Sequence, residues 1–169
     1  SYSSPMQVGS GTDWKQATAG YRFGLAVKTN GTLWSWGYGE RGNLANNVAN
    51  PSNEISSPIQ VPGTNWANGE NKVAILGKGM PSNQGLAAAA IKTDGTLWVW
   101  GHNYYGNLGL NSQTQYSSPV QIPGSTWAVV QMDNNNVFAT KTDGTLWSWG
   151  NNTHGELAQN NRTNNKSPV

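Results

Sequence analysis

The sequence contains no cysteine among its 169 residues. Disulfide bonds, thiolate nucleophiles and cysteine-ligated metal sites are therefore excluded. Charged residues are also few: they make up 11% of the chain, with a formal net charge of +2, whereas average soluble domains contain about 25%. The ten Lys and Arg residues are scattered, so no nucleic-acid partner is expected. So low a charge is unusual for the crowded cytoplasm and favours an extracellular or virion-associated location.

Long apolar runs and catalytic motifs are absent as well. No stretch approaches the roughly 18 consecutive apolar residues that span a bilayer, so membrane insertion is not expected. The first residues, Ser1–Pro5, lack the charged and apolar regions of a signal peptide. The only two histidines, His102 and His154, occupy different places in their loops, so no metal site and no cofactor are expected. Without a Gly-x-Ser-x-Gly elbow or a repeated pair of carboxylates, we predict that the chain is not an enzyme.

The dominant positive feature of the sequence is a repeat. The chain has 21 Gly, 22 Asn and nine Trp, a composition typical of aromatic-rich strands joined by tight turns. The segment Lys-Thr-(Asn/Asp)-Gly-Thr-Leu-Trp-x-Trp-Gly occurs three times, at Lys28–Gly37, Lys92–Gly101 and Lys141–Gly150. A segment repeated in this way indicates one structural unit stacked beside copies of itself.

Each copy of this segment predicts a β-hairpin. In the first copy, residues 25–28 and 32–36 are expected to form the two strands. Asn30-Gly31 is expected to form a two-residue type I′ turn, in which both residues have positive φ. Trp34 and Trp36 share one face of the second strand. A lone hairpin would leave both in contact with water, so we expect a neighbouring copy to cover them.

A second pattern, Gly-x4-Gly-(Asn/Glu)-Leu, follows the second tryptophan of each copy. Its glycines permit a sharp turn, and its leucine is expected to fill the junction between copies. A packing position recurs in every unit whereas a ligand contact need not, so we interpret the repeated tryptophans as core rather than as stacking platforms for sugars or bases. The predicted structural core is Trp34, Trp36, Leu44, Trp98, Trp100, Leu108, Trp147, Trp149 and Leu157.

A third pattern, Ser-Pro-x-Gln-(Val/Ile), opens each copy. Proline is excluded from central strands, so this segment is predicted to be an edge strand or a link between units. The chain is predicted to be a single array over residues 1–169, with repeats at about 4–56, 57–117 and 118–166, and with 167–169 beginning another.

The second copy carries an insertion. The distance from Trp66 to Trp98 is 32 residues, whereas the equivalent distance is 20 residues in both other copies. The extra residues enter around 68–71 and 77–85, on either side of a predicted strand at 73–76. The apolar run at 86–91 is expected to be a buried strand.

The segment Trp100–Gly109 resembles the hallmark of regulator-of-chromosome-condensation repeats: Trp-Gly, an Asn, a Gly, then a polar residue and Leu-Gly. The resemblance covers essentially the whole chain as three repeats, and the repeats look like bacterial or marine-bacteriophage versions of the family. It implies an all-β fold of β-propeller blades, either part of a larger ring, typically of about seven blades, or completed by assembly. Two features depart from the family: Asn43, Asn107 and Glu156 replace the usual Gln, and the usual Gly-x-x-His is missing.

Positions that differ between copies are the better candidates for partner binding, because specificity should lie in what varies. They lie in the insertion and in the Gly-x4-Gly loops, and Tyr and Arg are favoured at binding hot spots. The expected partner is a protein or a glycan, further copies of this chain, or other blades of a longer chain. The candidate partner-binding residues are Tyr38, Arg41, Asn68, Glu70, Lys78, His102, Tyr104, Tyr105 and His154.

Together these features favour a non-enzymatic interaction or structural module. The similarity to bacterial surface proteins and marine-bacteriophage proteins implies an adhesive role on a cell surface or a virion, for example in a tail appendage. A first alternative, implied by other members of the family, is a soluble regulator: an exchange factor for a small GTPase or an inhibitor of β-lactamase. A second alternative is a targeting module of a larger enzyme.

Overall fold

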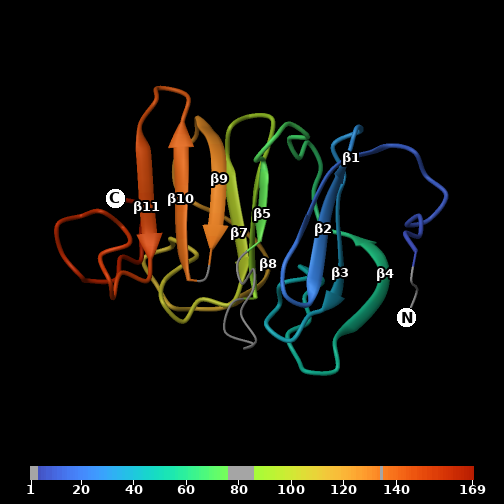
Figure 1. Cartoon of the computed structure of the whole chain (residues 1–169), viewed down its shortest axis with the longest axis horizontal. Helices are drawn as coiled ribbons and strands as arrows, with labels where there is room; N and C mark the ends of the chain where they lie inside the picture. Colours follow the sequence, from blue (N-terminus) through green and yellow to red (C-terminus); the bar gives the residue numbers. More distant parts are fainter. Residues whose placement is uncertain (1–3, 76–85, 134) are drawn as a thin grey trace.

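Every regular element in the described part of the chain is a β-strand. The structure is a computed structural model that describes residues 4–75, 86–133 and 135–169. Among these residues there is no helix that could cross a membrane. The strands form three antiparallel sheets, which stand side by side in the order of the sequence (Figure 1). The predicted strand at 86–91 is present as part of the second sheet.

The strands follow one another across each sheet in sequence order. The first sheet contains β1 (Trp14–Ala19), β2 (Phe23–Lys28), β3 (Leu33–Tyr38) and β4 (Glu54–Gln60). The second contains β5 (Val73–Ile75), β6 (Ala87–Ile91), β7 (Leu97–Gly101) and β8 (Tyr116–Gln121). The third contains β9 (Trp127–Asp133), β10 (Asn136–Lys141) and β11 (Leu146–Gly150).

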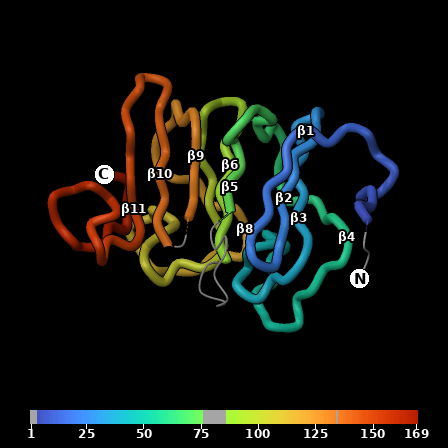
Figure 2. The backbone as a smooth tube through the Cα atoms, in the orientation of Figure 1, coloured from blue at the N-terminus to red at the C-terminus, as the bar shows by residue number. Residues whose placement is uncertain are grey.

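The first strand of each sheet lies toward the centre of the array. The short strand β5 packs against both β1 and β9, and the tube in Figure 2 shows β5 between the first and the third sheet. The chain then runs outward through each sheet, and β4 and β8 form outer edges. Pro58 and Pro119 lie in these two edge strands, as the Ser-Pro pattern predicts.

The third sheet is extended in the same way by the end of the described chain. The backbone N–H of Val169 donates to the carbonyl of Ser148 (3.2 Å), and the N–H of Ser148 donates back to Val169 (3.0 Å). The Ser-Pro segments at 57–61, 118–122 and 167–169 therefore pair with the sheet that precedes them, so a sheet spans two of the sequence repeats. The repeat boundaries themselves stay a prediction. The inserted residues 77–85, which include Lys78, lie outside the described residues.

The hairpins form as predicted, but the prediction of a type I′ turn is wrong. Gly31 has a positive φ of 76°, whereas Asn30 is not among the residues with positive φ. The N–H of Gly31 donates to the carbonyl of Lys28 (3.0 Å), and the N–H of Lys28 donates to Thr32 (2.9 Å). This is a three-residue loop, a type I turn followed by a left-handed glycine.

Side-chain bonding explains why this turn is adopted. The Asn30 side-chain oxygen accepts hydrogen bonds from the N–H (3.1 Å) and the hydroxyl (2.8 Å) of Thr32. Asp94 and Asp143 accept the same pair of bonds from the threonine two residues further on. Such a side-chain turn holds the Asn or Asp in a right-handed conformation and leaves positive φ to the glycine.

Two hydrophobic clusters fill the spaces between neighbouring sheets. The first joins side chains of β2 and β3, such as Leu25 and Leu33, to Val73 and Trp100 of the second sheet. The second joins the other face of the second sheet to the third sheet, for example Val99 to Trp149. The middle sheet is therefore buried on both faces, which the four consecutive alanines of β6 (Ala87–Ala90), all fully buried, make possible.

The second tryptophan of each copy anchors its sheet to the preceding one. Trp100 and Trp149 are fully buried, and their indole N–H groups donate to the backbone carbonyls of Asn43 (2.9 Å) and Asn107 (3.0 Å) in the preceding sheet. Trp36 occupies the same repeat position in the first sheet and is only half-buried. The expectation that a neighbouring copy covers these tryptophans thus holds for Trp100 and Trp149 and not for Trp36.

The first tryptophan of each copy has a different environment. Trp34, Trp98 and Trp147 are half-buried and meet a second tryptophan edge-on, at ring-centroid distances of 6.1 to 6.3 Å. These partners are Trp14, Trp66 and Trp127. The three leucines of the predicted core, Leu44, Leu108 and Leu157, are buried at 0 to 1% exposure.

Candidate functional site

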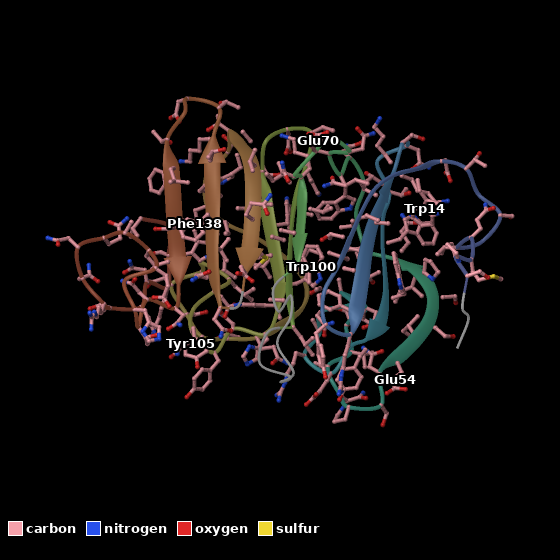
Figure 3. All side chains as sticks on the ribbon, viewed as in Figure 1. Trp14, Glu54, Glu70, Trp100, Tyr105 and Phe138 are labelled. Carbon is pink, nitrogen blue, oxygen red and sulfur yellow. The ribbon has the colours of Figure 1, made fainter. Side chains whose placement is uncertain are left out.

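The three Gly-x4-Gly loops lie at one end of the sheets. Each follows the third strand of its sheet, so the loops after β3, β7 and β11 leave the array at the same end (Figure 1). We refer to this end, defined by residues 37–43, 101–107 and 150–156, as the loop face. Figure 3 shows Tyr105 at this end and Glu70 at the opposite end.

A glycine is required where each loop begins. Gly37, Gly101 and Gly150 have φ of 103°, 100° and 104°, a region that side chains rarely adopt. A Cβ atom at Gly37 would also collide with the backbone carbonyl of Arg22. A Cβ atom at Gly101 would collide in the same way with the carbonyl of Leu86, and one at Gly150 with the carbonyl of Asn135. The glycine therefore lets the chain turn out of the sheet close to the preceding strand.

A buried asparagine organises the inside of each loop. The Asn103 side chain accepts from the N–H of Leu108 (2.9 Å) and donates to the carbonyls of Ser112 (3.1 Å) and Thr114 (2.9 Å). Asn152 makes the equivalent bonds in the third sheet. The first copy has Gly39 at this position, and Asn53 supplies the amide from the other side of the loop, donating to the Gly39 carbonyl (3.3 Å).

The residues that replace the family's usual Gln act locally. The side-chain amides of Asn43 and Asn107 donate to the carbonyls of Tyr38 (2.8 Å) and His102 (2.7 Å), closing their own loops. Glu156 accepts instead from the N–H of His154 (2.8 Å). Hydrogen bonds from its own and neighbouring backbone N–H groups hold the pKa of Glu156 below its ordinary value. The departures therefore leave the loop framework intact.

The second loop presents an aromatic cluster. Tyr104 is 64% exposed, and its ring meets Tyr105 edge-on at a centroid distance of 4.9 Å. The His102 ring lies parallel to Tyr104 at 6.3 Å and is itself buried, at 9% exposure. His102 therefore supports Tyr104 from beneath, and the two tyrosines form the part of the cluster that a partner can reach.

The first loop presents a charged aromatic cluster. The Tyr38 hydroxyl donates to Glu40 (2.8 Å), and this bond raises the pKa of Tyr38 above its ordinary value of 10.0. Arg41 pairs with the same carboxylate at 3.2 Å. The Arg22 guanidinium lies over the ring of Tyr38 at 5.2 Å and over that of Tyr21 at 5.0 Å.

Sequence reasoning missed Tyr21 and Arg22. They lie in the turn between β1 and β2, outside every repeated pattern, so only the adjacency of an aromatic and a cation gave a signal. A hollow of about 520 Å³ opens beside Arg22 and Tyr38, with Glu54 and Ile55 on its other side.

The third loop carries the remaining loop candidate, His154. Its side chain and that of Thr153 are exposed. The structure therefore places five candidates besides His154 on the loop face: Tyr38, Arg41, His102, Tyr104 and Tyr105.

The two candidates from the insertion lie at the opposite end of the sheets. The Asn68 side chain donates to the carbonyl of Thr29 in the first sheet (3.0 Å). Three residues later, the backbone carbonyl of Asn71 accepts from the N–H of Val130 (3.1 Å) in the third sheet. The segment 68–71, which leads into β5 of the second sheet, therefore ties the three sheets together. Glu70 is exposed between these contacts. The candidate Lys78 lies outside the described residues.

The carboxylates at the repeat turns serve geometry. Hydrogen bonds from Thr96, first from its hydroxyl and then from its N–H, lower the pKa of Asp94, and Thr145 does the same for Asp143. Among residues 4–75, 86–133 and 135–169, no three His, Asp or Glu side chains gather as a metal site would require. The loop face offers aromatic rings, cations and amide groups, which suit the binding of a surface.

Sheets that share a central row of first strands and open their loops at one end are the blades of a β-propeller. Two segments of the chain match models of one family of such blades. Residues 14–43 and residues 94–133 both match the regulator of chromosome condensation (RCC1) repeat. Both segments are thus similar to RCC1 repeats, and the predicted hallmark at Trp100–Gly109 lies within the second of them.

Solved structures show the same fold. Human WBSCR16 is 21% identical, with a TM-score of 0.79 over 99% of this chain and 42% of that one. Prp20p from Saccharomyces cerevisiae is 14% identical, with a TM-score of 0.73 over 93% of this chain and 38% of that one. Yeast RCC1 (Prp20) bound to Kap60 is 14% identical, with a TM-score of 0.72 over 93% of this chain and 36% of that one.

These comparisons confirm the predicted all-β fold of propeller blades. The chain spans about two fifths of the length of each of these solved structures. No curated protein matches its sequence.

Proposed function

We propose that this chain is a non-enzymatic propeller segment that binds a protein partner through its loop face. The observation that carries the proposal is the tyrosine pair on the loop that Asn103 braces: Tyr104 is 64% exposed, and the half-buried Tyr105 packs edge-on against its ring. Tyrosine and arginine are enriched at interface hot spots. Binding residues are typically carried on loops that a rigid scaffold positions.

The contrast between constant and variable positions supports this function. Buried amides and glycines recur in the three loops, whereas the pair of residues at the loop tip differs between them: Glu40-Arg41, Tyr104-Tyr105 or Thr153-His154. Prp20p, whose fold this chain shares, has a structure described together with its binding to Gsp1p and histones. The yeast RCC1 structure contains Kap60. Protein binding is thus a property of other propellers with this fold.

A capture experiment with matched variants tests the proposal. The immobilised chain is exposed to an extract of its source organism, and each captured protein is quantified for wild type, for the double variant Tyr104→Ser/Tyr105→Ser, and for Met6→Ser. Met6 is as exposed as Tyr104, at 63%, and lies in the segment before β1. The double variant should weaken capture at least ~10-fold, as loss of hot-spot side chains does, while Met6→Ser should not. Equal capture by all three proteins would exclude the tyrosines as the binding site.

We propose further that the setting is extracellular or virion-associated, with an adhesive role on a virion or bacterial surface. The support is compositional: only 11% of the residues are charged, and there are many Asn and Gly. A glycan partner would fit the same setting, and a glycan array with wild type and the double tyrosine variant tests it. Glycan binding that survives the double variant would place that partner elsewhere on the chain.

The alternative is a soluble protein-binding regulator, and the specific observation that favours it is the structural likeness to Prp20p. This version of the function predicts accelerated nucleotide release from a small GTPase, or inhibition of β-lactamase, at micromolar concentrations of the chain. If the chain produces neither effect at these concentrations, the alternative is excluded and the adhesive role is left.

A further inference from the structure

A hollow of about 440 Å³ opens between the second and third sheets, at the end opposite the loop face. At this end the hairpin turn of the second sheet stands beside the start of β9 (Figure 1), and these two segments form its walls. Its lining residues lie between 67 and 142, away from both ends of the chain. Small molecules bind in pockets of about 300–1,000 Å³, so the hollow is large enough for a small ligand.

The equivalent place between the first and second sheets is filled by a side chain. The amide of Asn68 donates there to the backbone carbonyl of Thr29 (3.0 Å). Asn68 belongs to the insertion 68–71, which has no counterpart in the third copy. Thr93 occupies the Thr29 position in the second copy, and its carbonyl accepts no hydrogen bond from the part of the chain that the structure describes. The hollow is thus lined by a residue whose counterpart in the first interface is paired with an amide.

Polar groups and a small apolar floor surround this carbonyl. One oxygen of the exposed Asp94 carboxylate accepts from the N–H (3.0 Å) and the hydroxyl (2.7 Å) of Thr96, which leaves the other oxygen to accept from a ligand. The exposed Thr126 lines the opposite wall. Ala67 and Ile91, both buried, also line the hollow. This combination suits a ligand with neighbouring hydroxyls, an amide and a small apolar group.

Backbone strain at Thr126 is a second, independent observation. Its φ is 71°, in the left-handed region, where a β-branched residue is a rare outlier. The bend is needed because the N–H of Trp127 donates to the carbonyl of Gly95 (2.9 Å) in the second hairpin. Asn65 makes the same bend in the first interface with a φ of 61°, which asparagine adopts readily. Strained residues cluster at functional sites, so a threonine at this position indicates a role for its side chain in the hollow.

We propose that this hollow binds a sugar that carries an acetamido group. The acetamido N–H donates to the Thr93 carbonyl, as the Asn68 amide does to its counterpart in the first interface, and the acetamido methyl group packs on the apolar floor. Ring hydroxyls of the sugar donate to the second oxygen of Asp94 and bond to the hydroxyl of Thr126. The site lies at the opposite end of the sheets from the loop face and does not rest on the function proposed for that face.

Titration of the ¹⁵N-labelled chain with N-acetylglucosamine, N-acetylgalactosamine and N-acetylmannosamine tests the proposal. Glucose, galactose and mannose, which have a hydroxyl in place of the acetamido group, are the matched ligands. At least one acetamido sugar should shift the amide NMR signals of residues 93–95 and 126–128 with a Kd of ~1 mM, and its matched sugar should bind at least ~10-fold more weakly. No shifts up to ~50 mM, equal binding of the matched sugar, or shifts confined to the loop face would each overturn the proposal.

Two matched substitutions test the carboxylate. Asp94→Asn keeps the turn, because Asn30 forms the same turn in the first copy, and it removes the charge. Sugar binding should weaken at least ~5-fold, since hydrogen bonds to a charged acceptor are the stronger ones. Asp143→Asn makes the same change in a turn that does not line the hollow, and it should bind the sugar as wild type does. Equal binding by Asp94→Asn and wild type contradicts the site.

Thr126→Asn separates a role in binding from a role in the fold. Asparagine relieves the backbone strain, as Asn65 does in the first interface, so the melting temperature should rise by ~2–4 °C. Sugar binding should nevertheless weaken at least ~5-fold, because the threonine hydroxyl is lost. A gain in stability combined with a loss of binding is the signature of a residue kept for its ligand. A variant that binds the sugar as tightly as wild type overturns the assignment, whatever its stability.

Discussion

At the scale of single residues, the repeated lysine has a structural role that its repetition alone did not explain. The Lys92 ammonium lies 5.0 Å from the ring centre of Trp66 and 4.3 Å from that of Trp98. Lys28 and Lys141 lie between two tryptophans in the same way. A cation over an aromatic face is attracted by the ring quadrupole, so each lysine joins the start of its inner strand to its hairpin.

Replacing Lys92 by methionine removes this attraction while keeping most of the apolar stem. We expect the free energy of unfolding to fall by about 0.5–2 kcal/mol. Lys92→Arg keeps the cation and serves as the matched control, with a smaller loss. Urea unfolding followed by tryptophan fluorescence measures both variants. Equal losses for Met and Arg would show that packing of the stem, rather than the cation, is what matters.

The turn carboxylates give the stability a defined dependence on pH. The pKa values of Asp94 and Asp143 are lowered in the folded chain from an ordinary value of 3.8. A lowered pKa means that the ionised carboxylate stabilises the fold above pH 3.8. That stabilisation is lost as the pH falls through the folded pKa.

The chain offers its own control for this effect, because the first copy uses Asn30 at the same position and Asn does not titrate. The melting temperature of the double variant Asp94→Asn/Asp143→Asn should therefore fall less than that of wild type when the pH is lowered from about 5 to about 2. Thermal melts across this range measure the difference. Parallel pH profiles for the two proteins would show that these carboxylates contribute nothing to acid sensitivity.

At the scale of elements, the second tryptophan of a repeat is an inter-sheet anchor only where a preceding sheet exists. The indole of Trp100 crosses from the second sheet to the carbonyl of Asn43 in the first. Trp36 has the same sequence context and no described sheet to cross to. One repeat position thus has two energetic roles, which the sequence of the repeat cannot distinguish.

A pair of identical substitutions separates these roles. Trp100→Phe removes the buried hydrogen bond and leaves the Asn43 carbonyl without this donor, which should cost about 1–3 kcal/mol. Trp36→Phe should cost much less, because Trp36 is only half-buried and crosses to no described sheet. Chemical unfolding at low protein concentration compares them. A loss for Trp36→Phe as large as that for Trp100→Phe would contradict the anchoring role.

Local signals predicted the elements well, and contacts distant in sequence were harder to predict. The hairpin strands, the buried run of β6 and the edge position of the Ser-Pro strands all follow from period, turn residues and proline. The turn type was missed because Asn-Gly is compatible with two hairpin loops, and the Thr32 hydroxyl decides between them. The stabilising role of Asn53, 14 residues after Gly39, has no counterpart in the other repeats.

At the scale of the whole molecule, the fold separates residues that sequence reasoning had grouped. Positions that vary between copies were grouped as one set of binding candidates, yet they lie at both ends of the sheets (Figure 3). Asn68 and its neighbours tie the sheets together, whereas Tyr104 is exposed on the loop face. Variation between copies therefore marked two different things, an inter-sheet brace and an exposed surface.

The proposed binding surface is the loop face, whereas residues 68–71 at the opposite end brace the sheets. Hydrogen–deuterium exchange of the chain, with and without the protein it captures, measures this directly. We predict slower exchange on binding at residues 38–43, 102–107 and 151–156, with no change at 68–71 and in the hairpin turns. Protection of 68–71 and the turns, with none in the three loops, would contradict the assignment of the loop face as the binding site.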